Sequence, residues 1–165
     1  MKFSIINTKN EHLEDILFLN ESSLPAVSSV NIYEMKKFLK TADYFKTLLV
    51  DKVISGFLIA LHPGRDYHSL NYKWFEKRYK SFLYVDRIVI TSKYRGYGIG
   101  KAFYKDLEIF ALNKTDTITC EVNIKPKNTG SIFFHKQYGF YQVGTQSTEN
   151  GKKEVSLMEY KIKLV

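Results

Sequence analysis

One segment constrains the fold of this chain more than any other, residues 84–109 with the sequence YVDRIVITSKYRGYGIGKAFYKDLEI. It begins with an apolar run, continues into a short loop rich in Gly, Arg and Lys, and ends with apolar residues at helical spacing. The first N–H groups of a helix have no intrahelical acceptor, and together with the helix dipole they attract a phosphate group. The segment therefore predicts a strand, an anion-binding loop and a helix, in that order.

Glycine occupies every second position of the loop, which reads RGYGIGK from Arg95 to Lys101. Without a Cβ atom these residues let the backbone turn tightly and approach a ligand closely. Neither of the better-known glycine-rich phosphate loops fits, because the dinucleotide-binding loop spaces its glycines differently and the P-loop lysine is followed by a hydroxyl residue, where this chain has Ala102. The loop is predicted to bind a pyrophosphate without a metal ion.

The strand, the loop RGYGIG at residues 95–100 and the helix together resemble the acetyl-CoA-binding motif R/Q-x-x-G-x-G/A of the GNAT superfamily of acyltransferases. Residues 128–140, NTGSIFFHKQYGF, resemble a later motif of that superfamily, in which Asn and a small residue open a helix that ends in Gly-Phe. The resemblance implies an acetyl-CoA-dependent N-acetyltransferase of the α/β class. Its expected fold is a central, mixed, mostly antiparallel twisted sheet of about six to seven strands, flanked by helices and split in a V between the two central strands.

Acetyl transfer from a thioester to an amine needs a base, a polarised carbonyl and a proton for the leaving thiolate. The resemblance implies two candidate bases, Asp86 on the strand before the loop and Glu121 on the strand predicted at residues 117–123. Each acid has a structural alternative, an ion pair with Arg87 for Asp86 and with a lysine for Glu121. The superfamily's thiolate-protonating Tyr is replaced by His135, which is either the general acid or a partly exposed surface histidine.

The resemblance also implies which residues bind acetyl-CoA. Backbone N–H groups of the strand before the loop would polarise the thioester carbonyl, and Asn128 would bond the pantetheine arm or cap the following helix. The implied coenzyme-binding residues are Ile88, Val89, Ile90, Arg95, Gly96, Tyr97, Gly98, Ile99, Gly100, Lys101, Asn123, Asn128 and Phe134. No metal ion is expected to take part.

An irregular segment rich in aromatic and basic residues, residues 62–82, precedes the strand of the anion loop. One interpretation is a short helix over residues 72–79 that covers the sheet with its aromatic side chains. The other is a lid over the acceptor site, because long loops in compact domains are often functional. In the second interpretation Tyr72 and Trp74 would contact the acceptor substrate.

The remaining elements follow from apolar periodicity and turn residues. Strands are predicted at residues 3–6, 44–51, 52–61, 117–123, 140–144 and 154–163, and helices at residues 10–19, 31–40 and 131–138. The strands at 44–51 and 52–61 form a hairpin with its turn at Asp51 and Lys52. At 165 residues the chain is expected to form a single acetyltransferase domain, residues 1–165.

Composition excludes several classes of protein. The single cysteine, Cys120, allows no internal disulfide, and no apolar run approaches the ~20 residues of a membrane span, so a cytoplasmic protein is expected. The net charge of +8 comes from scattered lysines, which makes nucleic acid an improbable partner. The expected partners are acetyl-CoA and an unidentified amine acceptor, with a homodimer possible. A non-catalytic acyl-CoA sensor and a basic nucleic-acid-associated protein remain as alternative functions.

Overall fold

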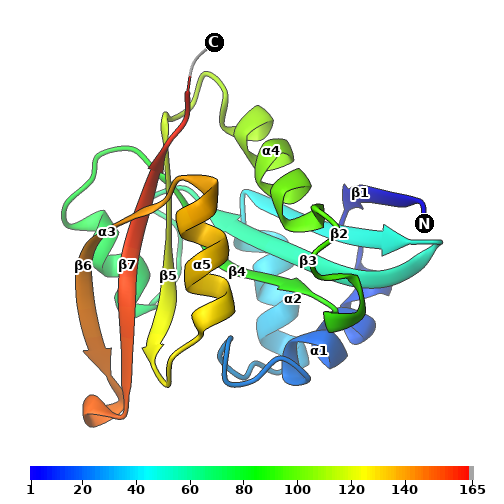
Figure 1. Ribbon diagram of the computed structural model, residues 1–165, viewed down its shortest axis with the longest axis horizontal. Coiled ribbons are helices and arrows are strands. Elements are labelled where there is room, and N and C mark those ends of the chain that lie inside the picture. Colours follow the sequence, from blue (N-terminus) through cyan, green and yellow to red (C-terminus); the bar gives the residue numbers. More distant parts are fainter. Residues whose placement is uncertain (164–165) are drawn as a thin grey trace. The chain divides into compact units, whose positions relative to one another are not determined.

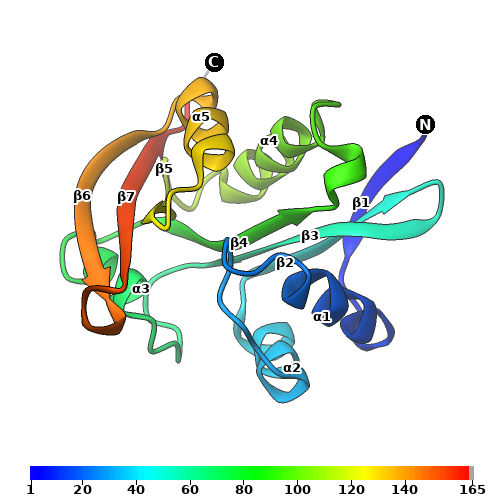
Figure 2. The same ribbon diagram turned by 60° about the horizontal axis from the view of Figure 1, so that its bottom comes forward.

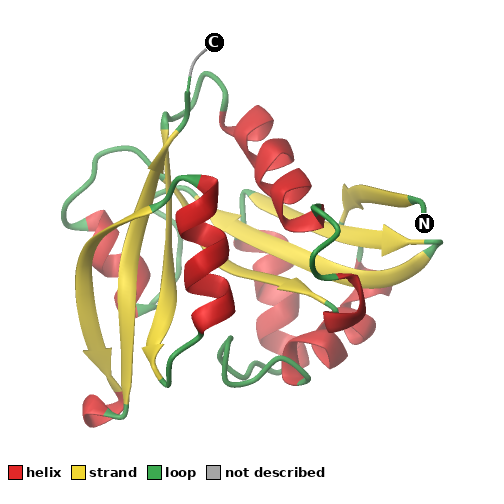
Figure 3. Cartoon of the chain, in the orientation of Figure 1, coloured by secondary structure: helices red, strands yellow, loops and turns green. Residues whose placement is uncertain are grey.

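The computed structural model describes residues 1–163 and contains one mixed sheet of seven strands in the order β1-β2-β3-β4-β5-β7-β6 (Figure 1). Helices accompany the sheet, which confirms the predicted α/β class (Figure 3). The chain divides into two compact units, each assembled from two separate stretches. Unit 1 contains residues 1–61 and 87–110, and unit 2 contains residues 62–86 together with the chain from residue 111 onward.

Nearly all predicted elements are present, with ends shifted by a few residues. The strands are β1 (Phe3–Asn7), β2 (Tyr44–Val50), β3 (Val53–Leu61), β4 (Leu83–Ile90), β5 (Thr117–Lys125), β6 (Tyr141–Thr148) and β7 (Lys153–Lys161). The α-helices are α1 (Leu13–Glu21), α2 (Ile32–Thr41), α3 (Leu70–Glu76), α4 (Ile99–Ala111) and α5 (Thr129–Tyr138). Short 3-10 turns occur at Asn10–His12, Ser92–Tyr94 and Glu149–Gly151.

Unit 1 is built on the antiparallel strands β1, β2 and β3. Helices α1 and α2 cover one face of these strands and α4 covers the other, as the two views in Figures 1 and 2 show. The predicted hairpin turn is confirmed, since Asp51 and Lys52 adopt φ angles of 48° and 70°, the left-handed geometry of a two-residue turn. Side chains from α1, α2, β2, β3 and α4 are buried between the layers, among them Ile16, Met35, Leu48, Phe57, Phe103 and Leu107.

A buried arginine fixes the connection between α1 and α2. Arg87, only 5% exposed, donates from Nη1 to Asn20 Oδ1 at 2.8 Å and to the Ser28 carbonyl at 3.1 Å. Its Nη2 donates to Ser28 Oγ at 3.2 Å. The guanidinium therefore joins the end of α1 to the loop before α2, in addition to any pairing with an acid.

Unit 2 is built on β5, β7 and β6, which pair antiparallel, with the start of β4 added in parallel to β5. Helices α5 and α3 lie on opposite faces of these strands (Figures 1 and 2). The side chains of β7 show the two faces, because neighbouring residues of a strand point in opposite directions. Tyr160 packs against Tyr138 of α5, whereas Glu159 accepts a hydrogen bond from Tyr79, just after α3.

The segment at residues 62–82 contains α3, which begins at Leu70 rather than Tyr72 because Ser69 accepts a hydrogen bond from the Tyr72 N–H and caps the helix. Tyr72 and Phe75 are fully buried. The interpretation of a short helix that covers the sheet with aromatic side chains is therefore confirmed. Tyr72 belongs to the core of unit 2, which corrects the expectation that its side chain is available to an acceptor.

Candidate active site

The predicted anion loop lies in unit 1 between β4 and α4. Gly96 and Gly98 adopt φ angles of +82° and +79°, a conformation that L-residues other than Gly avoid, and no atom lies within 4 Å of where a Cβ would stand. Helix α4 begins at Ile99, and its first turn includes a hydrogen bond from the Ala102 N–H to the Gly98 carbonyl at 3.0 Å. The loop thus presents exposed backbone at the N-terminus of a 13-residue helix.

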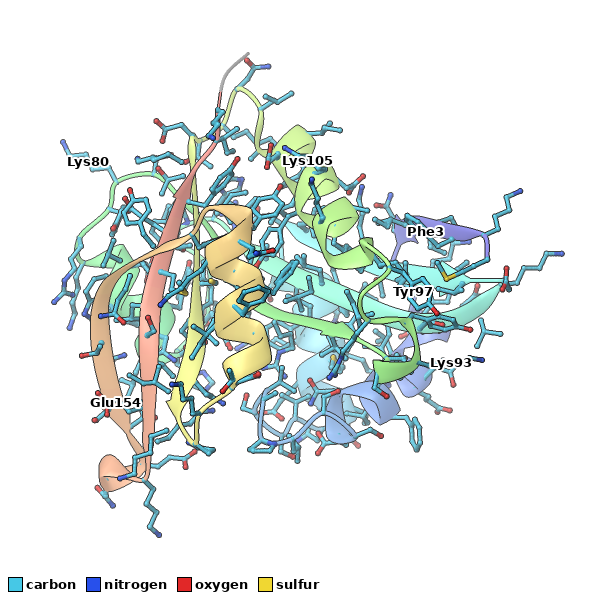
Figure 4. The ribbon with its side chains drawn as sticks, in the orientation of Figure 1. Phe3, Lys80, Lys93, Tyr97, Lys105 and Glu154 are labelled. Atoms are coloured by element: carbon cyan, nitrogen blue, oxygen red, sulfur yellow. The ribbon has the colours of Figure 1, made fainter. Side chains whose placement is uncertain are left out.

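The charges around this loop are exposed. Arg95 and Lys101 lie on its surface, and Lys93 and Tyr97 also extend from it (Figure 4). Arg95 Nε donates to the Ile90 carbonyl at 3.0 Å, which ties the loop to the end of β4 and leaves the rest of the guanidinium exposed. Positive charge, open backbone and a helix N-terminus are what a diphosphate needs, so the residues fit the phosphate groups of a coenzyme.

A polar cluster and apolar packing hold α4 in place beneath the loop. Asp106 accepts a hydrogen bond from the Tyr44 hydroxyl at 2.7 Å and pairs with Lys46 at 2.6 Å, both from β2. Phe103 and Leu107 are fully buried on the inner side of the helix. These contacts fix the position of α4, whose first residues follow the loop.

Burial alternates along the second half of the strand before the loop. Val89 is buried, while Ile88 and Ile90 are partly exposed. A Cβ added to Gly56 of β3 would stand 2.4 Å from the Val89 carbonyl oxygen, so β3 approaches β4 as closely as only a glycine allows. The expected use of backbone N–H groups near Val89 and Ile90 to polarise a thioester stays a prediction.

The register of unit 2 brings the two candidate bases together. The last parallel pair between β4 and β5 joins Val85 to Cys120, and the residues that follow are Asp86 and Glu121. Neighbouring residues at the same level of two paired strands point to the same face of the sheet. Both carboxylates therefore lie side by side on one face, and both residues are partly exposed.

Two tyrosine hydroxyls bond to these carboxylates. Tyr84, which is fully buried, donates to Glu121 Oε1 at 2.8 Å, and Tyr67, from the segment before α3, donates to Asp86 Oδ1. The rings of Tyr67 and Tyr84 each lie 5.5 Å from the ring of Tyr72, which stands between them. The second oxygen of Glu121, Oε2, is buried and accepts no hydrogen bond from the described part of the chain.

This environment makes Glu121 a weak acid. Its pKa is raised to about 8, first because burial disfavours the charged carboxylate and second because the negative charge of Asp86 is close. The Tyr84 hydrogen bond, the Asn71 side-chain amide and the charge of Lys153 oppose the rise. A carboxyl with a pKa near neutrality can exchange a proton with an amine, as a general base does.

His135 lies on the other face of the sheet of unit 2. It belongs to α5, is 3% exposed, and packs against Phe140, whose ring contacts Tyr160. Its Nδ1 is 2.7 Å from the Ser131 carbonyl, so Nδ1 carries the proton and donates it there. Burial lowers the His135 pKa to about 4, so the ring is neutral at pH 7. The expectation of an exposed histidine is wrong, and the structure does not bring His135 together with Asp86 and Glu121.

The other coenzyme-binding candidates in unit 2 have structural partners. Asn128 caps α5 by accepting a hydrogen bond from the Ser131 N–H at 3.1 Å, which confirms the capping alternative. Asn123 is buried, and its carbonyl accepts from the Asn128 N–H at 3.0 Å. Phe134 is partly exposed on α5. A contact of any of these with a coenzyme stays a prediction.

Trp74, the remaining acceptor-binding candidate, is packed between two partners. The Arg78 guanidinium lies 3.9 Å from the centre of its ring, and a Cβ at Gly144 of β6 would stand 2.6 Å from Trp74 Cζ2. This packing gives Trp74 a structural role in unit 2. It does not test whether Trp74 contacts an acceptor.

Sequence reasoning missed the tyrosines that hold carboxylates. Besides Tyr67 and Tyr84, the hydroxyls of Tyr79 and Tyr141 both donate to Glu159, which is 7% exposed. The high tyrosine content was the only available signal, and it does not say which hydroxyl meets which acid, since the partners are 18 to 80 residues apart.

The fold and the loop define a class of protein, the acyltransferases that bind a phosphate-bearing thioester at a glycine loop. Comparison with family models identifies the family within this class. The acetyltransferase (GNAT) family model matches residues 13–140, and the chain belongs to this family. Comparison with curated protein sequences gives no match.

Solved structures share the fold at low sequence identity. Ard1 from Thermoplasma volcanium has a TM-score of 0.80 and 13% identity over 99% of this chain and 100% of that chain. NAA60 from Arabidopsis thaliana in complex with acetyl-CoA has a TM-score of 0.77 and 14% identity over 98% and 100%. A GNAT-family acetyltransferase from Streptococcus pneumoniae has a TM-score of 0.69 and 20% identity over 98% and 100%.

Residues 1–163 contain neither a membrane-spanning helix nor a cluster of metal ligands. No helix there has the length and apolar character needed to cross a membrane. No group of three or more His, Cys, Asp or Glu side chains in that part of the chain is arranged to hold a metal ion.

Proposed function

We propose that this chain transfers an acetyl group from acetyl-CoA directly to a primary amine. Family membership supports the reaction type, and the exposed glycine loop with Arg95 and Lys101 supports binding of the coenzyme's diphosphate. The similar NAA60 structure is a complex with acetyl-CoA, and that of Naa50 from Arabidopsis thaliana is a complex with a bisubstrate analogue, CoA-Ac-MVNAL. A coenzyme thioester and an amine acceptor are therefore the substrates we assign.

The observation that carries the proposal is the state of Glu121. Its Oε2 is buried without a hydrogen-bond donor among residues 1–163, and its pKa is about 8. We assign it as the base in preference to Asp86, because burial and the neighbouring charge of Asp86 raise the pKa of Glu121 to about 8. Asp86 then acts through its charge, which makes Glu121 more basic.

The chemistry balances with these groups. The acceptor enters as an ammonium ion and gives one proton to Glu121, and the free amine forms a C–N bond to the thioester carbonyl carbon. The C–S bond breaks with its electron pair on sulfur, the nitrogen gives up its surplus proton as it becomes an amide, and the thiolate takes up one proton to leave as CoA. We do not assign that proton to His135, since its ring is neutral and Nδ1–H is bonded to Ser131.

The remaining expectations stay predictions under this proposal. They are coenzyme contacts of Ile88, Val89, Ile90, Asn123, Asn128 and Phe134, an acceptor contact of Trp74, a single domain over residues 1–165, a cytoplasmic location and a homodimer. The acyl group is taken to be acetyl because the family is named for it.

Isothermal titration with acetyl-CoA, followed by a thiol-release assay with amines, amino acid amides and peptides, tests the proposal. We expect binding, and CoA release with at least one acceptor. Glu121→Gln should bind acetyl-CoA like the parent and lose at least about 100-fold in kcat/KM, whereas Glu14→Gln, an exposed acid on α1, should change neither. Binding without release from any acceptor would make the chain a sensor, and no binding would overturn the assignment of the loop.

A further inference from the structure

We propose that one exposed face of α1 is a docking surface for a basic amphipathic helix of a partner protein. The partner helix would carry two cations two helical turns apart, with apolar residues between them. The surface, called here the α1 hollow, is lined by Glu14, Leu17, Phe18, Glu21 and Ile32. All five residues belong to unit 1, and the inference goes beyond the proposed acetyl transfer.

The position of the α1 hollow follows from helical spacing. Its four α1 residues are three or four positions apart, so they share one face of the helix. The buried residues of α1 are Leu13, Ile16 and Asn20, which occupy another face. Ile32 is the first residue of α2, which lies beside α1 (Figure 2). The α1 hollow is therefore separate from the contact between α1 and the core of unit 1.

The floor of the hollow is apolar and accessible. Phe18 is 72% exposed, although Phe is among the residue types most often buried. Leu17 and Ile32 are partly exposed beside it. A single exposed apolar side chain is ordinary, whereas several that line one hollow form a patch suited to a partner.

The charge of this region is opposite to that of the whole chain. Residues 10–35 contain five acids and no Lys or Arg, in a chain of net charge +8. The pKa of Glu21 is lowered, first by the hydrogen bond from the Val30 N–H and then by that from the Ser29 hydroxyl, with the smallest effect from Arg87. Arg87 itself is 5% exposed. The α1 hollow therefore offers a negative rim to a partner.

The two rim acids specify the spacing of the partner's cations. Glu14 is exposed and has no hydrogen bond or ion pair with another residue of 1–163. Glu14 and Glu21 are seven residues apart, which places them about 10 Å apart along the helix axis. A partner helix matches this rim with cations at positions i and i+7 and the apolar floor with residues at i+3 and i+4.

Other occupants fit the α1 hollow less well. Nucleic acids and anionic membranes would be repelled by its acids. None of the helices α1 to α5 carries two Lys or Arg residues seven positions apart, so a second copy of residues 1–163 lacks the matching helix. A basic helix from a different protein is therefore the occupant that we assign.

The experiment uses a fluorescein-labelled peptide of about 18 residues, long enough to form a helix. It carries Lys at positions i and i+7, Leu at i+3 and i+4, and Ala and Gln elsewhere. A comparison peptide has Glu in place of both Lys. Fluorescence anisotropy with the full chain should give saturable binding of the basic peptide with a Kd of about 100 μM or tighter. The acidic peptide should bind at least about tenfold more weakly, and added salt should weaken the basic peptide's binding.

Two pairs of variants locate the binding surface. Phe18→Ser should weaken binding of the basic peptide at least about fivefold, whereas Phe133→Ser, at a 62% exposed position on α5, should leave it unchanged. Glu14→Lys should weaken binding at least about tenfold. Asp15→Lys makes the same change in net charge at an exposed neighbour outside the α1 hollow, so its effect should be several-fold smaller. Circular dichroism checks that each variant is folded.

Defined outcomes would overturn the proposal. They are no saturable binding, equal binding of the basic and acidic peptides, or equal losses in Glu14→Lys and Asp15→Lys. Sedimentation of the protein alone is a further test. Self-association that Phe18→Ser abolishes would assign the α1 hollow to a second copy and also overturn the proposal. Acetyl transfer is measured separately, so none of these outcomes depends on it.

Discussion

The Tyr84 hydroxyl donates to Glu121 Oε1 over 2.8 Å, and this bond joins two adjacent parallel strands at the end of their pairing. Tyr84 is fully buried, and burial, followed by the charge of Glu121, raises the pKa of its phenol well above the ordinary value. Tyr84 therefore remains a donor at every physiological pH. It fixes one oxygen of Glu121, whose other oxygen is buried.

The ionisation of Glu121 predicts the pH dependence of the reaction. A base must be deprotonated to act, so kcat/KM should rise with pH and level off above about 8, the pKa of Glu121. Asp86→Asn removes one cause of the raised pKa, so the rising limb should move to lower pH. A pH profile of thiol release measures both. An unshifted limb in the variant would show that Asp86 does not act on the base.

Stability should depend on pH through the same group. The folded-state pKa of Glu121 is raised to about 8 from an ordinary value of 4.5, so the folded chain holds this proton where the unfolded chain has lost it. The contribution of the protonated Glu121 carboxyl to the free energy of unfolding is therefore full below pH 4.5 and is lost as pH rises towards 8. Glu121→Gln should match the parent at pH 4 and exceed it by on the order of 1–3 kcal/mol at pH 9. Urea unfolding at both pH values checks the sign.

The anion loop depends on left-handed glycines. Gly98→Val should abolish measurable acetyl-CoA binding, because a β-branched residue cannot hold φ near +79° and the loop must rearrange. Gly151→Val is the matched control, since Gly151 has φ of +82° and equally open surroundings in another turn. Both variants should lose about 1–2 kcal/mol of stability, but only the first should lose binding in a calorimetric titration. Parallel losses would point to general strain instead.

Arg87 should be important for stability because it connects α1 to the following loop through three donated hydrogen bonds. Arg87→Lys keeps the charge but cannot reproduce the planar fork, so Asn20 or Ser28 loses a partner. We expect a loss of about 1–3 kcal/mol in the free energy of unfolding, with faster proteolysis within residues 22–31. Unchanged stability would show that water replaces these bonds.

The packing of Trp74 should require a glycine at position 144. An alanine Cβ would stand 2.6 Å from Trp74 Cζ2, so Gly144→Ala should cost about 1–3 kcal/mol. Trp74→Leu should relieve the clash, and the double variant should be more stable than the sum of the single effects by at least about 1 kcal/mol. Gly130→Ala in α5, where no atom lies within 4 Å, is the control and should not destabilise. Additive effects of the two substitutions on stability would argue against a contact between Trp74 and position 144.

Much of the fold followed from local patterns. The turn at Asp51 and Lys52, the cap at Asn128 and the order of strand, glycine loop and helix each depend on residues within a few positions of one another, so they could be predicted from the sequence. The start of α3 was missed by two residues because Ser69 supplies a cap within a segment without clear periodicity.

The assignment of roles at the candidate site could be predicted less well. Asp86 and Glu121 were both identified, but their adjacency comes from the pairing of Val85 with Cys120. His135 occupies the position that a Tyr holds in the superfamily motif. It lies on the side of α5 that packs against Phe140, and it is therefore buried. The motif alone does not specify the environment that sets a side chain's pKa.

The sequence by itself determined the helices and strands of this protein, its glycine loop and the candidate catalytic side chains, because these depend on backbone preference and short-range spacing. Only the tertiary structure decided that Tyr67 bonds Asp86 and that Tyr84 bonds Glu121, partners 19 and 37 residues apart. Strand register and sheet face bring such groups together, and burial then changes their acidity. Strand register and burial both depend on residues that are far apart in the sequence. For that reason the candidate base could be distinguished only in the folded chain.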